Sequence, residues 1–244
     1  MLLDRDCQTN FPECRAADTA RSDFPFENRA RRLPLVRRVV QPRQCLLHAG
    51  QPSRAIYFVH SGCFKVSITS ADGREKVTGF RMRGEMIGLD AIGTQSHGSD
   101  VVALEKGEVW ELPLSLYSGA HAETEWLRQH LTSAMAEEIR RDWQWMLSLG
   151  TLNAEQRVVT FLLDLAERQN SLGFGISQLT LRMTRADLGN FLALQLETVT
   201  RALSRLASEH LIEVRRRDIR IIAPARLLQR LQDAAGDASR HVAA

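Results

Sequence analysis

The segment "LTLRMTRADLGNFLALQLETVTRALSRLASEHLIEVRRRDIRII", from Leu179 to Ile222, decides the fold of the C-terminal part of the chain. Thr184 precedes Asp187 by three residues, which is the spacing of a helix capping box, so we predict that a helix begins here. The apolar face of this helix is expected to consist of Leu188, Phe191 and Leu192. The stretch "FLALQL" then predicts a short turn, and "LETVTRALSRLASEH" predicts a second helix.

The second helix has two distinct faces. Its inward face is expected to consist of Val199, Leu203 and Leu206. Its outward face is expected to consist of Glu197, Thr200, Arg201 and Ser204. The following "LIEVRRRDIRII" predicts a β-hairpin with Arg216, Arg217 and Asp218 at its tip. Helix, short turn, helix and hairpin is the order of a winged helix-turn-helix, which places its second helix in the major groove of DNA.

The outward side chains suit base reading. Arg201 can donate two hydrogen bonds to guanine O6 and N7, and Glu197 can accept one from a cytosine amino group. The two residues are four apart, so they project from the same face, and Thr200 between them can contact a base or a thymine methyl. The alternative for Glu197 and Arg201 is a plain surface salt bridge. The residues expected to contact the DNA backbone or flank the bases are Arg182, Thr184, Arg185, Gln195, Leu196, Ser204, Arg216 and Arg217.

The charge distribution agrees with this role. Residues 151–244 contain 13 arginines, no lysine and 10 acidic residues, whereas residues 1–150 contain 19 basic and 19 acidic residues. The whole excess of +3 therefore lies in the C-terminal part, and all of it is arginine, whose planar fork fits phosphates and guanine edges. A general codon bias toward arginine is the alternative explanation.

The rest of the chain predicts an α+β protein. Short strand-like runs broken by turn signals such as Asp72-Gly73 predict an N-terminal antiparallel β-roll. "ETEWLRQHLTSAMAEEIRRDWQWMLSLG" predicts one long helix, and Asn153 is a candidate N-cap for the next. We predict five segments: an N-terminal tail at 1–32, containing a short helix or a solvated stretch, a β-roll sensor-like domain at 33–120, a dimerisation helix at 121–150, a winged helix-turn-helix at 151–225, and a C-terminal tail at 226–244.

The long helix is too long for one small domain to cover, so we expect a second copy of the chain to bury its apolar stripe. The residues assigned to this interface are Leu127, Leu131, Met135, Ile139, Asp142 and Met146. An ordinary core helix is the alternative. Trp143 and Trp145 are expected either to pack against the β-roll or to bridge to the DNA-binding domain.

The sequence resembles the CRP/FNR family of bacterial transcription regulators over nearly its whole length. "MTRADLGNFLALQLETVTRALSRL" is similar to that family's helix-turn-helix, and "GREKVTGFRMRGEMIGLDAIG" and "NAEQRVVTFLLDL" resemble the FNR branch. The resemblance implies a cyclic-nucleotide-binding-like β-roll and a homodimer on a palindrome similar to TTGAT-N4-ATCAA. It also implies activation through contact of β-roll loops, such as residues 69–75, with RNA polymerase. Thr200 stands where the family's signature has serine, and Leu196 where the branch often has valine.

The same resemblance bears on an iron–sulfur cluster. The family's oxygen sensors hold [4Fe–4S] through three N-terminal cysteines and a fourth in the β-roll. Here Cys14 matches the first, but Ala17, Asp23 and Trp110 occupy the other three positions. Tryptophan cannot ligate iron, and a cluster needs four ligands. We therefore expect no cluster, although an unconventional site using Cys7, Cys14 and Asp23 is left open.

Other ligands have less support. "TQSHGSDVVALE" lacks the Arg-Ser pair with which the resemblance implies cyclic AMP is bound, and His48, His60 and His97 show no pattern for haem. We expect no cofactor and no metal. Cys14 is a candidate redox thiol, whereas Cys45 and Cys63 are expected to be buried small hydrophobes. A redox- or gas-responsive regulator and a ligand-binding module whose winged helix contacts protein are the alternatives.

Two further classes are excluded on the sequence. No nucleophile–base pairing, metal-ligand spacing or phosphate loop is present, so we do not expect an enzyme. No apolar run approaches the roughly 20 residues of a membrane span, and the first residues lack the order of a signal peptide, so a cytoplasmic protein is expected.

Overall fold

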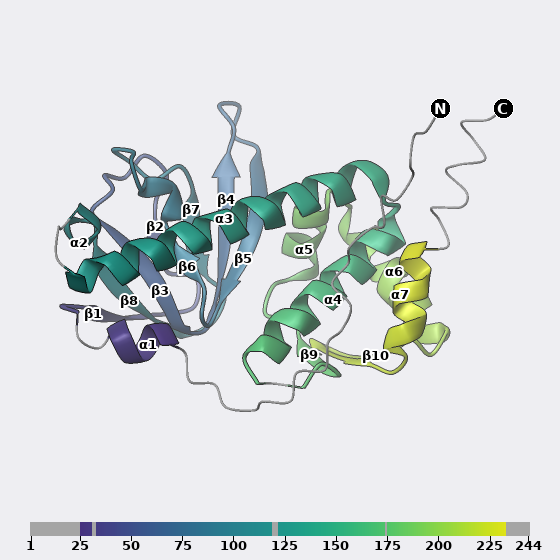
Figure 1. Ribbon diagram of the computed structural model, residues 1–244. Helices are drawn as coiled ribbons and strands as arrows, with labels where there is room; N and C mark the ends of the chain where they lie inside the picture. The colour runs from purple at the N-terminus through teal and green to yellow at the C-terminus, as the bar shows by residue number, and fades with distance from the viewer. Residues whose placement is uncertain (1–24, 31–32, 119–121, 174, 233–244) are drawn as a thin grey trace, which may run out of the picture.

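The structure is a computed structural model that describes residues 25–30, 33–118, 122–173 and 175–232 (Figure 1). Within these residues, no helix is both long enough and apolar enough to cross a membrane. The N-terminal half is a β-roll, the long helix α3 runs along it, and the C-terminal half is a smaller, mainly helical unit (Figure 1).

The β-roll consists of two four-stranded antiparallel sheets, with strand orders β1-β8-β3-β6 and β2-β7-β4-β5. A core of apolar side chains between the sheets includes Val59, Phe64, Val101 and Val109. The turn between β4 and β5 holds Gly73 at φ +83°, so the predicted Asp72-Gly73 hairpin is present. The strands are β1 Val36–Val40, β2 Cys45–Leu47, β3 Ala55–Ser61, β4 Cys63–Thr69, β5 Glu75–Met82, β6 Met86–Ile87, β7 Asp100–Ala103 and β8 Gly107–Pro113.

Three helices meet the outer face of the β1-β8-β3-β6 sheet. Helix α1, Pro25–Ala30, lies in the segment assigned to the N-terminal tail, and its Phe26 stacks on Phe58 at a ring distance of 4.5 Å. The short helix predicted for that segment is therefore present and packs on the β-roll. Helix α2, Ser115–Ser118, links the sheet to α3, Ala122–Thr151.

The first half of α3 corrects the expected dimer interface. Leu127 and Leu131 are almost fully buried, at 1% and 0% exposure, in one cluster with Phe58 and Trp110. They pack on their own β-roll, so neither is free to meet a second chain. A helical repeat of apolar residues does not reveal which surface covers them, and here the sheet covers the first two turns of the stripe.

The C-terminal unit has the predicted helix, turn, helix and wing. Its elements are α4 Ala154–Ser171, β9 Gln178–Thr180, α5 Arg185–Leu192, α6 Leu196–Ser208, β10 Ile212–Arg215, β11 Asp218–Ile221 and α7 Pro224–Gln232. Strand β9 joins the predicted hairpin as a third strand, in the order β10-β11-β9. Helix α7 includes residues 226–232, which were predicted to belong to a C-terminal tail, and its Leu227 is buried in the core shared with α4.

Capping and burial follow the predicted pattern. Thr184 and Asp187 form a reciprocal capping box at the start of α5, and Asn153 forms one with Gln156 at the start of α4. The residues assigned to the inward faces are all buried: Leu188, Phe191, Leu192, Val199, Leu203 and Leu206.

The β-roll holds α5 directly. Lys65 pairs with Asp187 at 3.2 Å, and the Asn190 side chain accepts from Val77 N at 2.7 Å and donates to Glu75 O at 2.9 Å. Trp145 of α3 lies edge-on to Phe191 with 4.7 Å between ring centroids. Trp145 therefore bridges to the DNA-binding unit, one of the two expected roles, and the orientation of α6 depends on these contacts.

Gly189 is required where α5 meets the turn. A Cβ at this position would lie 2.7 Å from the carbonyl oxygen of Leu194. We expect Gly189→Ala to lower the free energy of unfolding by about 1–3 kcal/mol, because the turn must move to admit a methyl group. Gly150→Ala is the control, since nothing lies within 4 Å of a Cβ there. Urea denaturation should show Gly150→Ala unchanged or stabilised, and equal effects of the two changes would contradict this view.

Candidate nucleic-acid interface

Helix α6 presents a polar face to solvent. Glu197, Arg201 and Ser204 are exposed and Thr200 is partly exposed, while Val199 on the opposite side is buried. The core side chains fix the rotation of the helix about its own axis. The residues predicted to read bases are therefore grouped on one accessible surface.

Arg201 is not held by Glu197. The structure records no ion pair between these two described side chains, and Arg201 Nη2 instead lies 3.4 Å from the hydroxyl of Thr198. The surface salt bridge considered as an alternative is thus not formed. Both charged groups remain available to a partner.

Thr200 is already partly engaged within the protein. Its hydroxyl donates to the Leu196 carbonyl at 2.9 Å, and Arg185 Nη1 donates to it at 3.4 Å. Because the hydroxyl proton is used inside the helix, Thr200 can offer a base its methyl group or an oxygen acceptor. Arg185 is thereby drawn from α5 over the recognition helix.

Two of the residues predicted to flank the bases or to contact the DNA backbone already have partners within the protein. Arg182 pairs with Glu105 of the β-roll at 2.9 Å, and the Thr184 hydroxyl is engaged in the capping box. Both would have to give up these contacts to reach a phosphate. The remaining flanking residues are exposed or partly exposed: Arg185, Gln195, Leu196, Ser204, Arg216 and Arg217.

The wing carries two further exposed arginines that were not assigned to DNA: Arg215, which pairs with Glu213 at 2.6 Å, and Arg220. Arg220 is exposed on β11, and its neighbours Ile219 and Ile221 are buried. The sequence "DIRI" alternates polar and apolar residues, which is the pattern of a strand with one face on the core. Arg220 therefore extends the basic surface of Arg216 and Arg217.

In the β-roll, the carboxylate of Glu85 is engaged in contacts within the protein. Its carboxylate accepts from Arg168 Nη2 at 2.8 Å, Arg141 Nη1 at 3.2 Å and the Met82 amide at 2.9 Å. Burial opposes ionisation, but these arginines hold the pKa of Glu85 below its usual value. Glu85, in the turn between β5 and β6, thus connects the β-roll to α3 through Arg141 and to α4 through Arg168.

The residues considered for a metal cluster or a redox thiol differ in burial and in their contacts. Trp110 is 2% exposed, and its indole donates to Glu108 at 3.0 Å, so no ligand projects from this position. Cys63 is buried as predicted, and burial raises the pKa of its thiol to about 12. Cys45 is only partly buried, so its assignment as a buried hydrophobe is wrong. Cys7, Cys14, Ala17 and Asp23 lie outside the described residues.

The Cys45 thiol and the three histidines lie in different environments. Burial, followed by the Asp100 carboxylate, raises the pKa of Cys45, whereas a redox thiol needs a lowered one. His60 stacks on Trp110 at 4.9 Å, and His97 is buried at 2% exposure. His48 directly follows β2, and its Nδ1 lies 3.4 Å from Asp100 Oδ1 on the neighbouring strand β7.

The second half of α3 carries an exposed apolar stripe. Its members are Ile139, Trp143, Met146 and Leu147, exposed by 49%, 63%, 66% and 65%. Two of the residues assigned to the dimer, Ile139 and Met146, belong to it, and Asp142 is exposed beside it. Met135 is only partly buried, packed at the edge of the β-roll cluster. Trp143 thus lies on the stripe rather than against either domain.

A recognition helix, a basic wing and a β-roll joined by one long helix define a winged helix-turn-helix DNA-binding regulator. Two domain families match this organisation: the Crp-like helix-turn-helix domain over residues 156–230 and the cyclic nucleotide-binding domain over residues 37–118. The chain belongs to the CRP/FNR family of transcription regulators.

Individual relatives support this family assignment. The chain is 35% identical to the anaerobic regulatory protein of Pasteurella multocida over 75% of its own length and 67% of the relative. It is 34% identical to the transcriptional activator protein Anr of Pseudomonas protegens, over 78% of each chain. Its fold is similar to that of FixK2 from Bradyrhizobium japonicum, with a TM-score of 0.72 and 27% identity over 81% of this chain and 97% of that structure. The two sequence relatives are named as a regulatory protein and a transcriptional activator, which are not enzymes.

Proposed function

We propose that the protein is a homodimeric transcription activator that binds a palindrome similar to TTGAT-N4-ATCAA and contacts RNA polymerase. The observation that carries the proposal is the solvent-facing polar surface of α6, on which Glu197 and Arg201 are exposed and form no ion pair with each other, with Thr200 between them. The likeness to a relative named as a transcriptional activator supports the direction of regulation.

We further propose that DNA binding requires neither an iron–sulfur cluster nor cyclic AMP. Buried Trp110 takes the place of the fourth cluster ligand, and Glu85 is saturated by arginines. The cavity of ≈ 150 Å³ beside Glu85 is lined by Glu137 and Glu138 as well as arginines, an unsuitable wall for a cyclic phosphate. The activity of such a regulator follows its abundance in the cell.

DNA binding by the full-length protein, prepared without oxygen and then exposed to air, tests this proposal. Each sample also needs an absorption spectrum and an iron assay. We expect a colourless, iron-free protein that shifts the palindrome equally in both conditions and does not shift a scrambled duplex. A brown sample whose binding collapses in air would show that the N-terminal residues hold a cluster. Equal shifts of palindrome and scrambled DNA would refute sequence-specific binding.

The dimer is predicted to form through the exposed stripe of α3. Trp143→Glu places a charge in the middle of this stripe twice per dimer, and we expect the dimer dissociation constant to rise by at least about 30-fold, the effect of losing an interface hot spot. Sedimentation equilibrium measures the change. Gln144→Glu adds the same charge one residue away, off the stripe, and should leave the dimer intact. Equal weakening by the two variants would refute the assignment of the stripe.

A further inference from the structure

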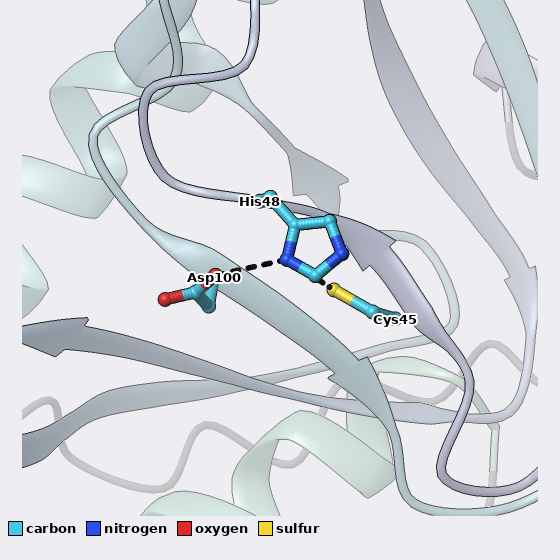
Figure 2. A group of neighbouring side chains, drawn as sticks. All are labelled: Cys45, His48 and Asp100. Atoms are coloured by element: carbon cyan, nitrogen blue, oxygen red, sulfur yellow. Dashed lines mark hydrogen bonds and ion pairs between the residues drawn. The ribbon is translucent and has the colours of Figure 1, made fainter.

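Three metal-ligating side chains meet at one edge of the β2-β7-β4-β5 sheet, far in sequence from the recognition helix. Cys45 begins β2, His48 follows its end, and Asp100 begins the neighbouring antiparallel strand β7 (Figure 2). The pairing of β2 with β7 shifts register between Cys45 and Leu47. This irregularity turns the end of β2 so that Cys45 and His48 approach the same point beside Asp100.

The distances fit a tetrahedral ion. His48 Nδ1 lies 3.5 Å from Cys45 Sγ and 3.4 Å from Asp100 Oδ1, and the three ligand atoms all lie within 4.8 Å of one another. Bonds of about 2.0–2.3 Å at tetrahedral angles place neighbouring ligand atoms about 3.3–3.8 Å apart. Two of the three separations already have this value.

The geometry distinguishes a metal site from a nucleophilic thiol. In a Cys–His–Asp relay the imidazole uses one nitrogen for the sulfur and the other for the carboxylate. Here the same atom, Nδ1, faces both Cys45 and Asp100 (Figure 2). No proton can pass through the ring from sulfur to carboxylate in this arrangement, whereas a single ion placed among the three atoms satisfies all of them.

We propose that Cys45 Sγ, His48 Nδ1 and Asp100 Oδ1 bind a zinc-class divalent ion, with water as the fourth ligand. Thiolate and imidazole together favour a borderline-soft ion over magnesium or calcium. The fourth position is open because the His48 side chain is 71% exposed and that of Asp100 is 30% exposed. Binding displaces the thiol proton to solvent, and the imidazole carries its proton on Nε2.

Surrounding hydrogen bonds hold two of the ligands in place. The Ala49 amide donates to Asp100 Oδ1 at 3.2 Å. The Cys45 thiol donates to the Leu47 carbonyl at 2.8 Å, and this bond breaks when the thiol loses its proton to bind the ion. The loop that carries His48 is held by the His48 amide donating to Gln51 Oε1 at 3.2 Å. Such outer contacts orient ligands before the ion arrives. The proposal revises the expectation that the chain holds no metal and is independent of the proposed DNA site.

Cobalt binding to reduced, chelator-treated full-length protein tests the site, because Co²⁺ reports thiolate ligation by a charge-transfer band. We expect one Co²⁺ per chain, displaced by Zn²⁺, and a higher thermal midpoint with Zn²⁺. Cys45→Ser should abolish the band. Asp100→Asn keeps an oxygen for the Ala49 amide but loses the charge, and should weaken binding at least about tenfold.

The controls separate this site from the other cysteines. The double variant Cys7→Ser/Cys14→Ser and the single variant Cys63→Ala should both keep the band and the affinity. Circular dichroism of Cys45→Ser checks that it folds, and Asp100→Asn supplies an independent ligand change. A band that is absent from the natural protein, survives Cys45→Ser, or disappears in Cys7→Ser/Cys14→Ser would overturn the proposal.

Discussion

Arg201→Ala is expected to weaken binding to the palindrome by about 1–3 kcal/mol per half-site, about 5- to 150-fold for each, and to leave binding to random DNA nearly unchanged. The effect is large because a dimer loses the contact twice. It is specific because the lost interaction is a bidentate hydrogen bond to one base. Fluorescence anisotropy with both duplexes at fixed salt measures it.

The structure supports assigning this loss to base reading rather than to folding. Arg201 is exposed, and its single described hydrogen bond joins it to Thr198 at 3.4 Å. Removing the side chain therefore leaves no buried partner unsatisfied. Unfolding of the variant should match that of the natural protein, and thermal denaturation checks this.

Arg216→Ala provides the matched comparison. Arg216 is equally exposed but lies in the turn of the wing, where we expect a phosphate contact. Its loss should weaken both duplexes alike and lower the salt dependence of binding by about one unit in slope. If Arg201→Ala behaves in the same way, Arg201 contacts a phosphate and its assignment to a base is wrong.

The sequence predicted best where the interactions are local. Thr184 and Asp187 form the capping box that their spacing predicts, and Asn153 caps α4 as expected, with Gln156 as a further partner. The alternation and turn of the wing are similarly local. The helix-turn-helix and its exposed face could therefore be predicted from a short stretch of chain.

The predictions failed where distant segments decide the outcome. Leu127 and Leu131 have the spacing of a dimer stripe, but the β1-β8-β3-β6 sheet covers them, which no helical periodicity reveals. Arg182 is predicted to contact a phosphate, and its ion pair with Glu105 of the β-roll is a competing contact that the local sequence does not reveal. The approach of Asp100 to Cys45 and His48 depends on strand pairing and a register shift, and the residues share no motif. Such contacts are set by topology and appear only in the folded chain.

Glu85→Gln is expected to lower the free energy of unfolding by about 3–5 kcal/mol, because it leaves Arg168 buried without its main charge partner. The Arg168 side chain is 13% exposed and donates to Glu85 at 2.8 Å and to the Phe80 carbonyl at 2.6 Å. Asp164, at 3.3 Å, compensates only in part. Urea denaturation followed by tryptophan fluorescence measures the loss, and Glu125→Gln, in an exposed helical pair with Arg128, should show a much smaller one.

The pH dependence of that difference identifies charge as its cause. Burial opposes ionisation of Glu85, but Arg168, Arg141 and Arg81 hold its folded pKa below the value of about 4.3 that applies in the unfolded chain. The unfolded state therefore binds the proton first as pH falls, so the stabilisation is complete above about pH 5 and declines below it. The difference in free energy of unfolding between the natural protein and Glu85→Gln should be constant near neutral pH and should become smaller in acid. A difference that stays constant in acid would mean that packing, not charge, joins the β-roll to α3 and α4.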